Sequence, residues 1–198
     1  MKIGITGSIA CGKSTVSAYL RGLGYPVVDA DAISRALTAP GGEALPLLRA
    51  AFGDGVFDGE CLNRRALGAL VFSSDAARAQ LNAILHPMII AQTERELLAL
   101  DTPGRLVFGD VPLLYECGME RLFDCVWVVA APRERQLERL HLRDGLSREQ
   151  AAARIDAQMP QQEKIARADA VIDTDAAPEQ TRLRVDALLE QLAERSHA

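Results

Sequence analysis

Two glycines, a lysine and a serine stand at fixed intervals near the start of the chain, in the stretch GSIACGKS from Gly7 to Ser14. This stretch fits the pattern GxxxxGK[ST] at every defined position, and chance matches in a chain of this composition are expected on the order of 0.001 times. Successive N–H groups of such a loop, with the helix N-terminus that follows, form a concavity for phosphate. The motif predicts a polyphosphate site, and the competing interpretation is a glycine-rich turn with a surface lysine.

The loop residues have separate expected roles. Lys13 is expected to reach the β and γ oxygens of the polyphosphate as a point charge. The Ser14 hydroxyl is expected to ligate Mg²⁺, and Gly12 lets the backbone approach the ligand closely. Cys11 precedes a predicted helix, whose N-terminus lowers a thiol pKa, so oxidation sensitivity is predicted for this residue.

Two acids, Asp29 and Asp31, end a second apolar segment in the stretch VVDADA. In an open α/β sheet, ligands bind outside the carboxyl ends of the strands, and alternation places both side chains on one side of an extended chain. A carboxylate there can accept the proton of an attacking hydroxyl. Asp31 can equally be the N-cap of a helix that starts at Ala32, and the residues alone leave both interpretations open.

A third acid, Asp110, ends the apolar run LVFGD. An aspartate at the end of a buried strand, paired with a phosphate loop, is expected to help hold Mg²⁺, often through water. This pattern is weak alone, because many buried strands end in an acid, and it gains weight from the loop motif.

Three arginines, Arg135, Arg139 and Arg143, recur every four residues and predict one stripe along a helix. Such a stripe can close over a polyphosphate and stabilise the charge that develops in phosphoryl transfer. The alternative is a solvated helix face that also carries Glu134 and Glu138, which is the commoner use of charged residues.

These residues need a scaffold, and five short apolar segments are predicted to be its strands. Runs without alternation are typical of strands covered on both faces of a parallel sheet. Helical patterns between them favour an α/β fold with right-handed crossovers. Ser147 and Gln150 predict a capping box, and Pro178 is expected to open the last helix. The predicted strands are residues 2–6, 26–29, 106–110, 125–129 and 170–173.

A segment of about 75 residues between the second and third strands is too long for a loop in a compact domain. Its leucine and isoleucine spacing is helical, so residues 32–104 are predicted to form a helical insertion. Within it, GDGVFDGE (residues 53–60) is expected to form turns. His86 and Pro87 are interpreted as a simple turn between two helices.

Composition limits the function classes. The net charge of −5 argues against a general nucleic-acid binder. No apolar run approaches the ~20 residues of a membrane span, and MKIGITG lacks the apolar core of a signal peptide, so a cytoplasmic protein is expected. Four cysteines without a CxxC pair predict thiols outside disulfides.

A GTPase switch is the main rival in another class. The stretch DTPG, from Asp101 to Gly104, matches its D-x-x-G element but precedes the third strand instead of ending one. No asparagine precedes a lysine, so the N-K-x-D guanine reader is missing. A mechanical or regulatory ATPase is harder to exclude. The insertion and the arginine stripe favour a kinase with an acceptor pocket and a lid that excludes water.

The chain resembles the dephospho-coenzyme A kinase family over nearly its whole length. The motifs that carry the resemblance are, in order, GITGSIACGKST, VVDADAISRAL, LNRRALGALVF, LNAILHPMI, GDVPLLYECGM, QLERLHLRDGLSREQAAARIDAQ and ADAVID. The resemblance implies a P-loop NTPase-type three-layer α/β fold with a five-stranded parallel sheet, a helical insertion and a helical lid. The implied nucleotide-binding core is residues 1–31, 105–131 and 160–198, the acceptor-binding insertion is 32–104, and the lid is 132–159.

The resemblance also implies a reaction, which is transfer of the ATP γ-phosphoryl group to the ribose 3′-hydroxyl of dephospho-CoA. Asp31 becomes the general base, Lys13, Arg139 and Arg143 assist phosphoryl transfer, and ATP and Mg²⁺ are the implied cofactors. A monomer or a small homo-oligomer is expected, and another small-molecule kinase, of nucleosides or their monophosphates, is the alternative. The implied ATP-binding residues are Ala10, Cys11, Gly12, Lys13, Ser14 and Thr15; the metal-binding ones are Ser14 and Asp110; the acceptor-binding ones are His86, Leu113, Tyr115 and Glu116.

The chain departs from the family pattern at two places. The family loop is usually closer to GGIGSGK, whereas Ser8, Ala10 and Cys11 stand here, which raises the question of whether a positive φ is needed at Ser8 or Ala10. An asparagine that the family usually has near the last strand is Thr174 here, so the adenine contact is open.

Overall fold

The computed structural model describes residues 1–196, with side chains through residue 194. The predicted core segment 160–198 therefore ends two residues beyond the described part of the chain. The chain divides into two compact units, Met1–Val28 with Leu97–Ala198 as the first and Asp29–Glu96 as the second.

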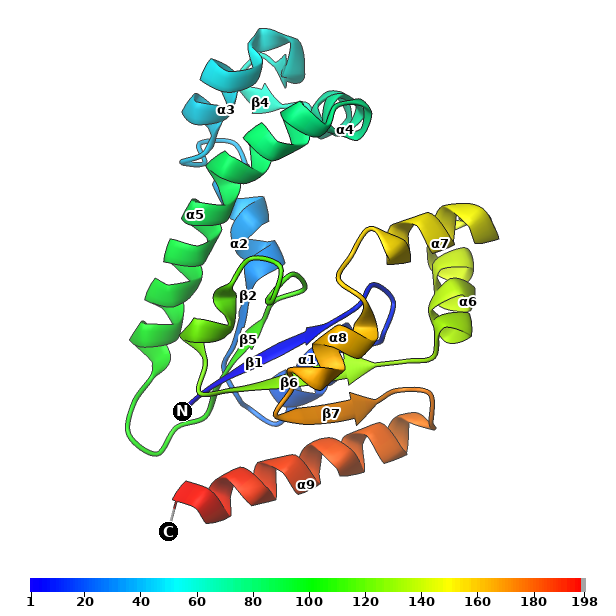
Figure 1. The fold of residues 1–198 in the computed structure, drawn as a ribbon. Helices are drawn as coiled ribbons and strands as arrows, with labels where there is room; N and C mark the ends of the chain where they lie inside the picture. The colour runs from blue at the N-terminus through cyan, green and yellow to red at the C-terminus, as the bar shows by residue number, and fades with distance from the viewer. Residues whose placement is uncertain (197–198) are drawn as a thin grey trace. The chain divides into compact units, whose positions relative to one another are not determined.

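A five-stranded parallel sheet is the centre of the fold, as predicted (Figure 1). The strand order is β2-β5-β1-β6-β7. The strands β2 and β5 lie on one side of β1, and the later strands β6 and β7 lie on its other side, so the strand order reverses at β1. Such a reversal is the point in an open α/β sheet where ligands bind beyond the carboxyl ends of the strands. The strands are β1 (Lys2–Gly7), β2 (Val27–Asp29), β5 (Val107–Asp110), β6 (Cys125–Ala130) and β7 (Ala170–Asp173).

Both faces of the sheet are covered, which explains why its strands lack alternation. Every residue of β5 and β6 is buried. Gly4 of β1 lies opposite Gly109 of β5 in the strand register. A Cβ added at Gly4 would lie 2.9 Å from Phe123, and one at Gly109 would lie 2.5 Å from the same ring. The two glycines therefore make room for an aromatic side chain on one face.

The other face packs against the first and last helices of the unit, α1 (Lys13–Gly22) and α9 (Pro178–Ser196). Ile3 and Ile5 of β1 and Trp127 of β6 contribute to this core. Pro178 opens α9, as predicted. The remaining helices of this unit are η2 (Met119–Leu122), α6 (Arg133–Asp144), α7 (Arg148–Asp156) and α8 (Gln161–Ala166).

The helices α6 and α7 pack against each other at an angle and share a small apolar core of their own (Figure 1). Leu137 and Leu140 of α6 meet Ala151 of α7 in this cluster. The predicted capping box is present, because Ser147 accepts from the N–H of Gln150 and the Gln150 side chain accepts from the Ser147 N–H.

The second unit is mainly helical, as predicted for most of the insertion. One interpretation was wrong, because His86 and Pro87 lie inside one continuous helix. A proline within a helix removes one backbone hydrogen bond. The helical spacing of apolar residues continues on both sides of Pro87, and the helix continues through the proline. The helices are α2 (Ala30–Leu37), α3 (Leu45–Phe52), η1 (Asp54–Val56), α4 (Arg64–Ser73) and α5 (Asp75–Leu100).

The stretch at residues 53–60 is more ordered than the predicted turns. It contains η1 and leads into an antiparallel hairpin of β3 (Phe57–Asp58) and β4 (Cys61–Leu62). Strands of two residues are too short to show an alternating pattern. Among residues 1–196, no helix has both the length and the apolar character needed to cross a membrane.

Candidate nucleotide-binding site

The phosphate-loop motif forms the connection between β1 and α1, where the sequence placed it. Ala10 has φ +59° and Gly12 has φ +91°, both in the left-handed region. Left-handed residues beside right-handed ones turn successive N–H groups toward one side, which forms an anion nest. The N-terminus of α1 has no side-chain cap, so its first N–H groups suit an anionic ligand. Of the two loop positions where a positive φ was in question, Ala10 has one and Ser8 does not.

Glycine is required at position 12 for space as well as for backbone angle. A Cβ on Gly12 would lie 3.0 Å from Thr174 Oγ1 and 3.3 Å from Arg139 Nη1. Thr174 is buried, and its hydroxyl donates to the carbonyl oxygen of Cys11 at 2.5 Å. Thr174, which stands where an asparagine was expected, therefore holds the backbone of the phosphate loop at Cys11.

Lys13 and Asp110 form an ion pair in the structure, which brings together two predicted site residues. The β1–β5 register places Asp110 beside Ile5, just before the loop. Ser17, one turn after Lys13 on α1, donates to the other oxygen of the same carboxylate at 2.6 Å. Side-chain exposures of 15% for Lys13 and 7% for Asp110 leave this pair little contact with water. Sequence reasoning missed Ser17, because a buried serine in a helix carries no motif.

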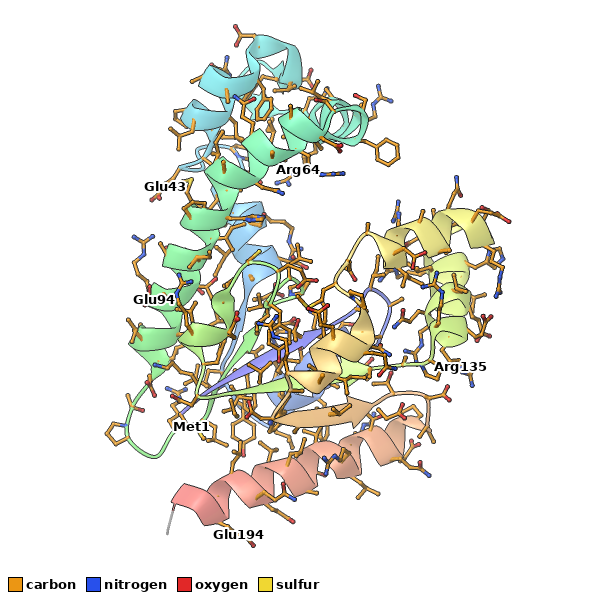
Figure 2. The ribbon with its side chains drawn as sticks, viewed as in Figure 1. Met1, Glu43, Arg64, Glu94, Arg135 and Glu194 are labelled. Atoms are coloured by element: carbon orange, nitrogen blue, oxygen red, sulfur yellow. The ribbon has the colours of Figure 1, made fainter. Side chains whose placement is uncertain are left out.

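The predicted arginine stripe lies on α6, but its members have different partners. Arg139 donates to the carbonyl oxygen of Ala10 at 3.2 Å and to that of Thr174 at 2.7 Å. Arg135, labelled in Figure 2, pairs with Asp175 and Glu138. Arg143 is largely exposed and pairs with Asp144. Only Arg139 of the three is therefore seated against the phosphate loop.

A cavity of about 710 Å³ opens beside the loop. The exposed hydroxyls of Ser14 and Thr15 lie in its lining, together with residues of α6 and of the segment after β7. The lining residues are Ala10, Gly12, Ser14, Thr15, Arg135, Glu138, Arg139, Leu142, Arg143, Thr174, Asp175, Ala176, Pro178 and Thr181.

The loop and its neighbours have the chemistry that a nucleotide with magnesium needs. Mg²⁺ in nucleotide sites takes one or two protein oxygens and completes its coordination with phosphates and water. Ser14 and Asp110 would be the residues of that small oxygen set. Within residues 1–196, no group of three or more His, Cys, Asp or Glu side chains forms a separate metal cage.

Cys11 lies deeper in the structure than its place in the phosphate loop suggested. Its side chain is 1% exposed and belongs to the core beneath the loop. Burial raises the pKa of the Cys11 thiol, and the lowering influence of the Lys13 backbone and of nearby cations does not offset it. Burial and the raised thiol pKa both argue against oxidation of Cys11, and its sensitivity to oxidants stays a prediction to be tested. None of the four cysteines, all in the described part of the chain, forms a disulfide.

The expected acceptor residues after β5 mostly contact their own unit. Tyr115 is buried, and its hydroxyl donates to the carbonyl oxygen of Arg167 at 3.0 Å. Glu116 pairs with Lys164 at 2.7 Å. Leu113 is 37% exposed. Sequence reasoning missed Lys164, a fully buried lysine on α8 that no motif marks.

The remaining predicted site residues belong to the second unit. His86 lies within α5. Asp29 is the N-cap of α2, because its side chain accepts from the N–H of Ala32 at 2.9 Å. Asp31 is exposed in the first turn of that helix. One interpretation of the sequence made Asp31 the N-cap of this helix, but Asp29 is the N-cap in the structure.

The strand order, with a glycine-rich phosphate loop at the reversal point, defines the fold of the P-loop kinases. The sequence profile of the family described as Dephospho-CoA kinase matches residues 1–180, and the chain belongs to this family.

Individual relatives agree with the family match. A dephospho-CoA kinase from Anaeromyxobacter dehalogenans is 50% identical, over 96% of this chain and 91% of the relative. The dephospho-CoA kinase structure from Campylobacter jejuni has a TM-score of 0.69 at 29% identity and covers 98% of this chain and 97% of its own. A crystal structure from Thermus thermophilus has a TM-score of 0.83 at 41% identity, with 97% of each chain covered. The similarity to these relatives extends over nearly the whole chain.

Proposed function

We propose that this protein transfers the γ-phosphoryl group of ATP to the ribose 3′-hydroxyl of dephospho-CoA, which yields coenzyme A and ADP. The observation that carries the proposal is the intact phosphate loop, with Lys13 and Asp110 in contact, in a chain whose residues 1–180 match the dephospho-CoA kinase family. This reaction is the last step of coenzyme A biosynthesis.

The phosphate loop holds ATP in this proposal. The N–H groups of residues 10–15 donate to the phosphate oxygens, and the exposed hydroxyls of Ser14 and Thr15 face the ligand. Lys13 leaves Asp110 and binds the β and γ oxygens, which carry more negative charge than one carboxylate. Ser14 and Asp110 are the residues that would hold Mg²⁺, which when bound neutralises charge on the β and γ phosphates.

Asp31 is the proposed general base. It is exposed, and the capping role that competed for it belongs to Asp29. Its carboxylate accepts the proton of the 3′-hydroxyl as the oxygen attacks phosphorus, and such assistance contributes ~10²–10⁴ in rate. The bond from phosphorus to the bridging oxygen of ADP breaks as the new ester bond forms.

The arginines of α6 complete the charge balance around the transferred group. Arg139 already lies against the loop through the Ala10 carbonyl, and Arg143 pairs with Asp144, the next residue on its own helix. We assign residues 132–159 as the lid and residues 32–104 as the acceptor-binding insertion, with residues 1–31, 105–131 and 160–198 as the core. His86, Leu113, Tyr115 and Glu116 remain the proposed acceptor-site residues, Tyr115 and Glu116 through the segment that they stabilise.

The proposal extends to the setting of the protein. The acceptor and ATP are its small-molecule partners, and its acidic net charge of −5 disfavours nucleic acid as a partner. A cytoplasmic monomer or small homo-oligomer without membrane attachment fits a biosynthetic kinase of this size.

An acceptor panel tests the function. The purified protein is assayed for ADP release with ATP and Mg²⁺, using dephospho-CoA, nucleosides, nucleoside monophosphates or no acceptor. Strong ADP release with dephospho-CoA only is the expected result. Preference for a nucleoside or its monophosphate would make the protein a different small-molecule kinase. Equal release without any acceptor would indicate a regulatory ATPase.

A further inference from the structure

The peptide segment Ile9–Ala10 of the phosphate loop is held from both sides by the predicted lid. The Ile9 N–H donates to Gln158 Oε1 at 2.7 Å. The Ala10 carbonyl oxygen accepts from Arg139 at 3.2 Å. Arg139 lies on α6, and Gln158 lies two residues after the end of α7, so the helix α6 and the segment after α7 each provide one hydrogen bond to adjacent loop residues.

Apolar packing strengthens the same connection. Ile9 and Ala10 pack against the cluster of Leu137, Leu140 and Ala151 that joins α6 to α7. The loop side chains are therefore part of the small core of the helical pair. A change in the position of the pair must change the environment of these two loop residues.

The segment held in this way is the strained part of the loop. Ala10 is the one non-glycine residue with a positive φ in the described part of the chain. A left-handed angle costs a residue with a Cβ about 1–2 kcal/mol, and such angles persist when surrounding contacts impose them. Gln158 and Arg139 are the polar contacts on either side of this angle.

Gln158 is itself fixed by its neighbour in the chain. The Met159 N–H donates to Glu116 Oε1 at 3.2 Å. Glu116 pairs with Lys164, which is fully buried and also donates to the Pro112 carbonyl oxygen at 3.3 Å. Thr6 of β1 donates to that same oxygen at 3.0 Å. These hydrogen bonds, with buried Lys164 and Thr6 among their members, anchor the end of the helical pair to the segment that follows β5 and to β1.

We propose that Gln158 is a positioning residue for phosphoryl transfer, which keeps the Ile9–Ala10 segment in its left-handed geometry and so aligns the N–H groups that bind the triphosphate. This inference rests on the proposed kinase function, and it adds a residue that acts through the loop without touching the acceptor. The hydrogen bond joins the base of the lid to the phosphate loop, so ATP binding and lid position are coupled there.

The test compares Gln158→Ala with the matched control Gln162→Ala, which removes an exposed glutamine four residues later. Two readouts are used, the Kd of ATP without acceptor and the steady-state constants with dephospho-CoA. For Gln158→Ala we expect about a tenfold weaker ATP affinity and a similar fall in kcat/KM for ATP, as for loss of about 1.4 kcal/mol. The KM for dephospho-CoA should stay at the wild-type value, and the control should match wild type throughout.

A second variant separates positioning from simple destabilisation. Gln158→Glu keeps an oxygen that accepts from Ile9 N–H, but it adds a negative charge near the triphosphate. Its loss of ATP affinity relative to wild type should shrink as salt is raised, because salt screens the repulsion between the new carboxylate and the phosphates. The loss in Gln158→Ala should not depend on salt in this way.

The outcomes are decisive in either direction. Wild-type ATP affinity and kcat/KM in a folded Gln158→Ala protein would overturn the proposal, and so would equal losses for ATP and dephospho-CoA. A wild-type protein inactive on dephospho-CoA would refute the kinase assignment alone, because the ATP affinities still report on Gln158. If Gln158→Ala does not fold, the salt dependence of Gln158→Glu decides.

Discussion

The ion pair between Lys13 and Asp110 leads to a prediction that differs from the usual effect of removing a site residue. The Lys13 ammonium contacts the Asp110 carboxylate, so the lysine must exchange this partner for phosphate oxygens when ATP binds. Asp110→Asn removes the competing charge. It should therefore strengthen the binding of ATP in the absence of Mg²⁺.

The magnitude follows from the burial of the pair. Hydrogen bonds to charged groups contribute about 1.5–3 kcal/mol, and side-chain exposures of 15% and 7% limit solvent screening here. An asparagine oxygen still accepts from Lys13, so the lower end applies, about 1.5 kcal/mol. This corresponds to roughly tenfold tighter binding of magnesium-free ATP. With Mg²⁺ present, the loss of a metal-holding carboxylate should lower turnover by about 10- to 100-fold.

Calorimetric titration of ATP into protein with a chelator measures the first effect, and initial rates with Mg²⁺ measure the second. Glu190→Gln, an exposed carboxylate on α9, controls for the change in net charge. Thermal unfolding verifies that the Asn variant is folded at the titration temperature. The reasoning is refuted if Asp110→Asn binds magnesium-free ATP no more tightly than wild type and Glu190→Gln do.

Three further predictions concern the base, the loop thiol and the two glycines at and just after the C-terminal end of α1. Asp31→Asn should lower kcat with dephospho-CoA by ~10²–10⁴ with little change in the Kd of ATP; wild-type turnover would remove Asp31 from catalysis. Iodoacetamide at neutral pH should label the exposed Cys61 and leave Cys11 and activity intact, because burial raises the pKa of the Cys11 thiol; mass spectrometry that finds early Cys11 labelling would contradict this. Gly22→Ala should raise the free energy of unfolding by about 0.4–1 kcal/mol, whereas Gly24→Ala should lower it by about 1 kcal/mol because of its φ of +87°. An added Cβ meets nothing within 4 Å at either glycine, so the two variants differ in backbone angle and not in steric contacts. Equal changes in the free energy of unfolding, measured by denaturant titration, would contradict this explanation.

The sheet was predictable because its strands are buried on both faces and end at recognisable residues. All five predicted strands lie within one or two residues of the observed bounds. The phosphate loop was predictable for a related reason, since its function depends on backbone N–H groups and thus on a short continuous motif. Asp110 followed from its place at the end of β5.

Other features depend on contacts that spacing does not encode. His86 and Pro87 resembled a turn, yet the proline lies within a 26-residue helix, because a local breaker cannot be weighed without the packing around it. The pKa of the Cys11 thiol depends on how deeply the side chain is buried, which only the fold determines. The partners of Arg139 and Glu116, and the roles of Gln158 and Lys164, come from residues distant in sequence.

The destination of the γ-phosphoryl group tests the central claim most directly. ATP labelled in its γ-phosphate is incubated with the protein, Mg²⁺ and dephospho-CoA, and the label is located in the products by phosphorus NMR and by a 3′-specific phosphatase. The account predicts stoichiometric label in a monoester on the ribose 3′-oxygen of coenzyme A. Label found only in inorganic phosphate, or at any other position of the acceptor, would contradict it.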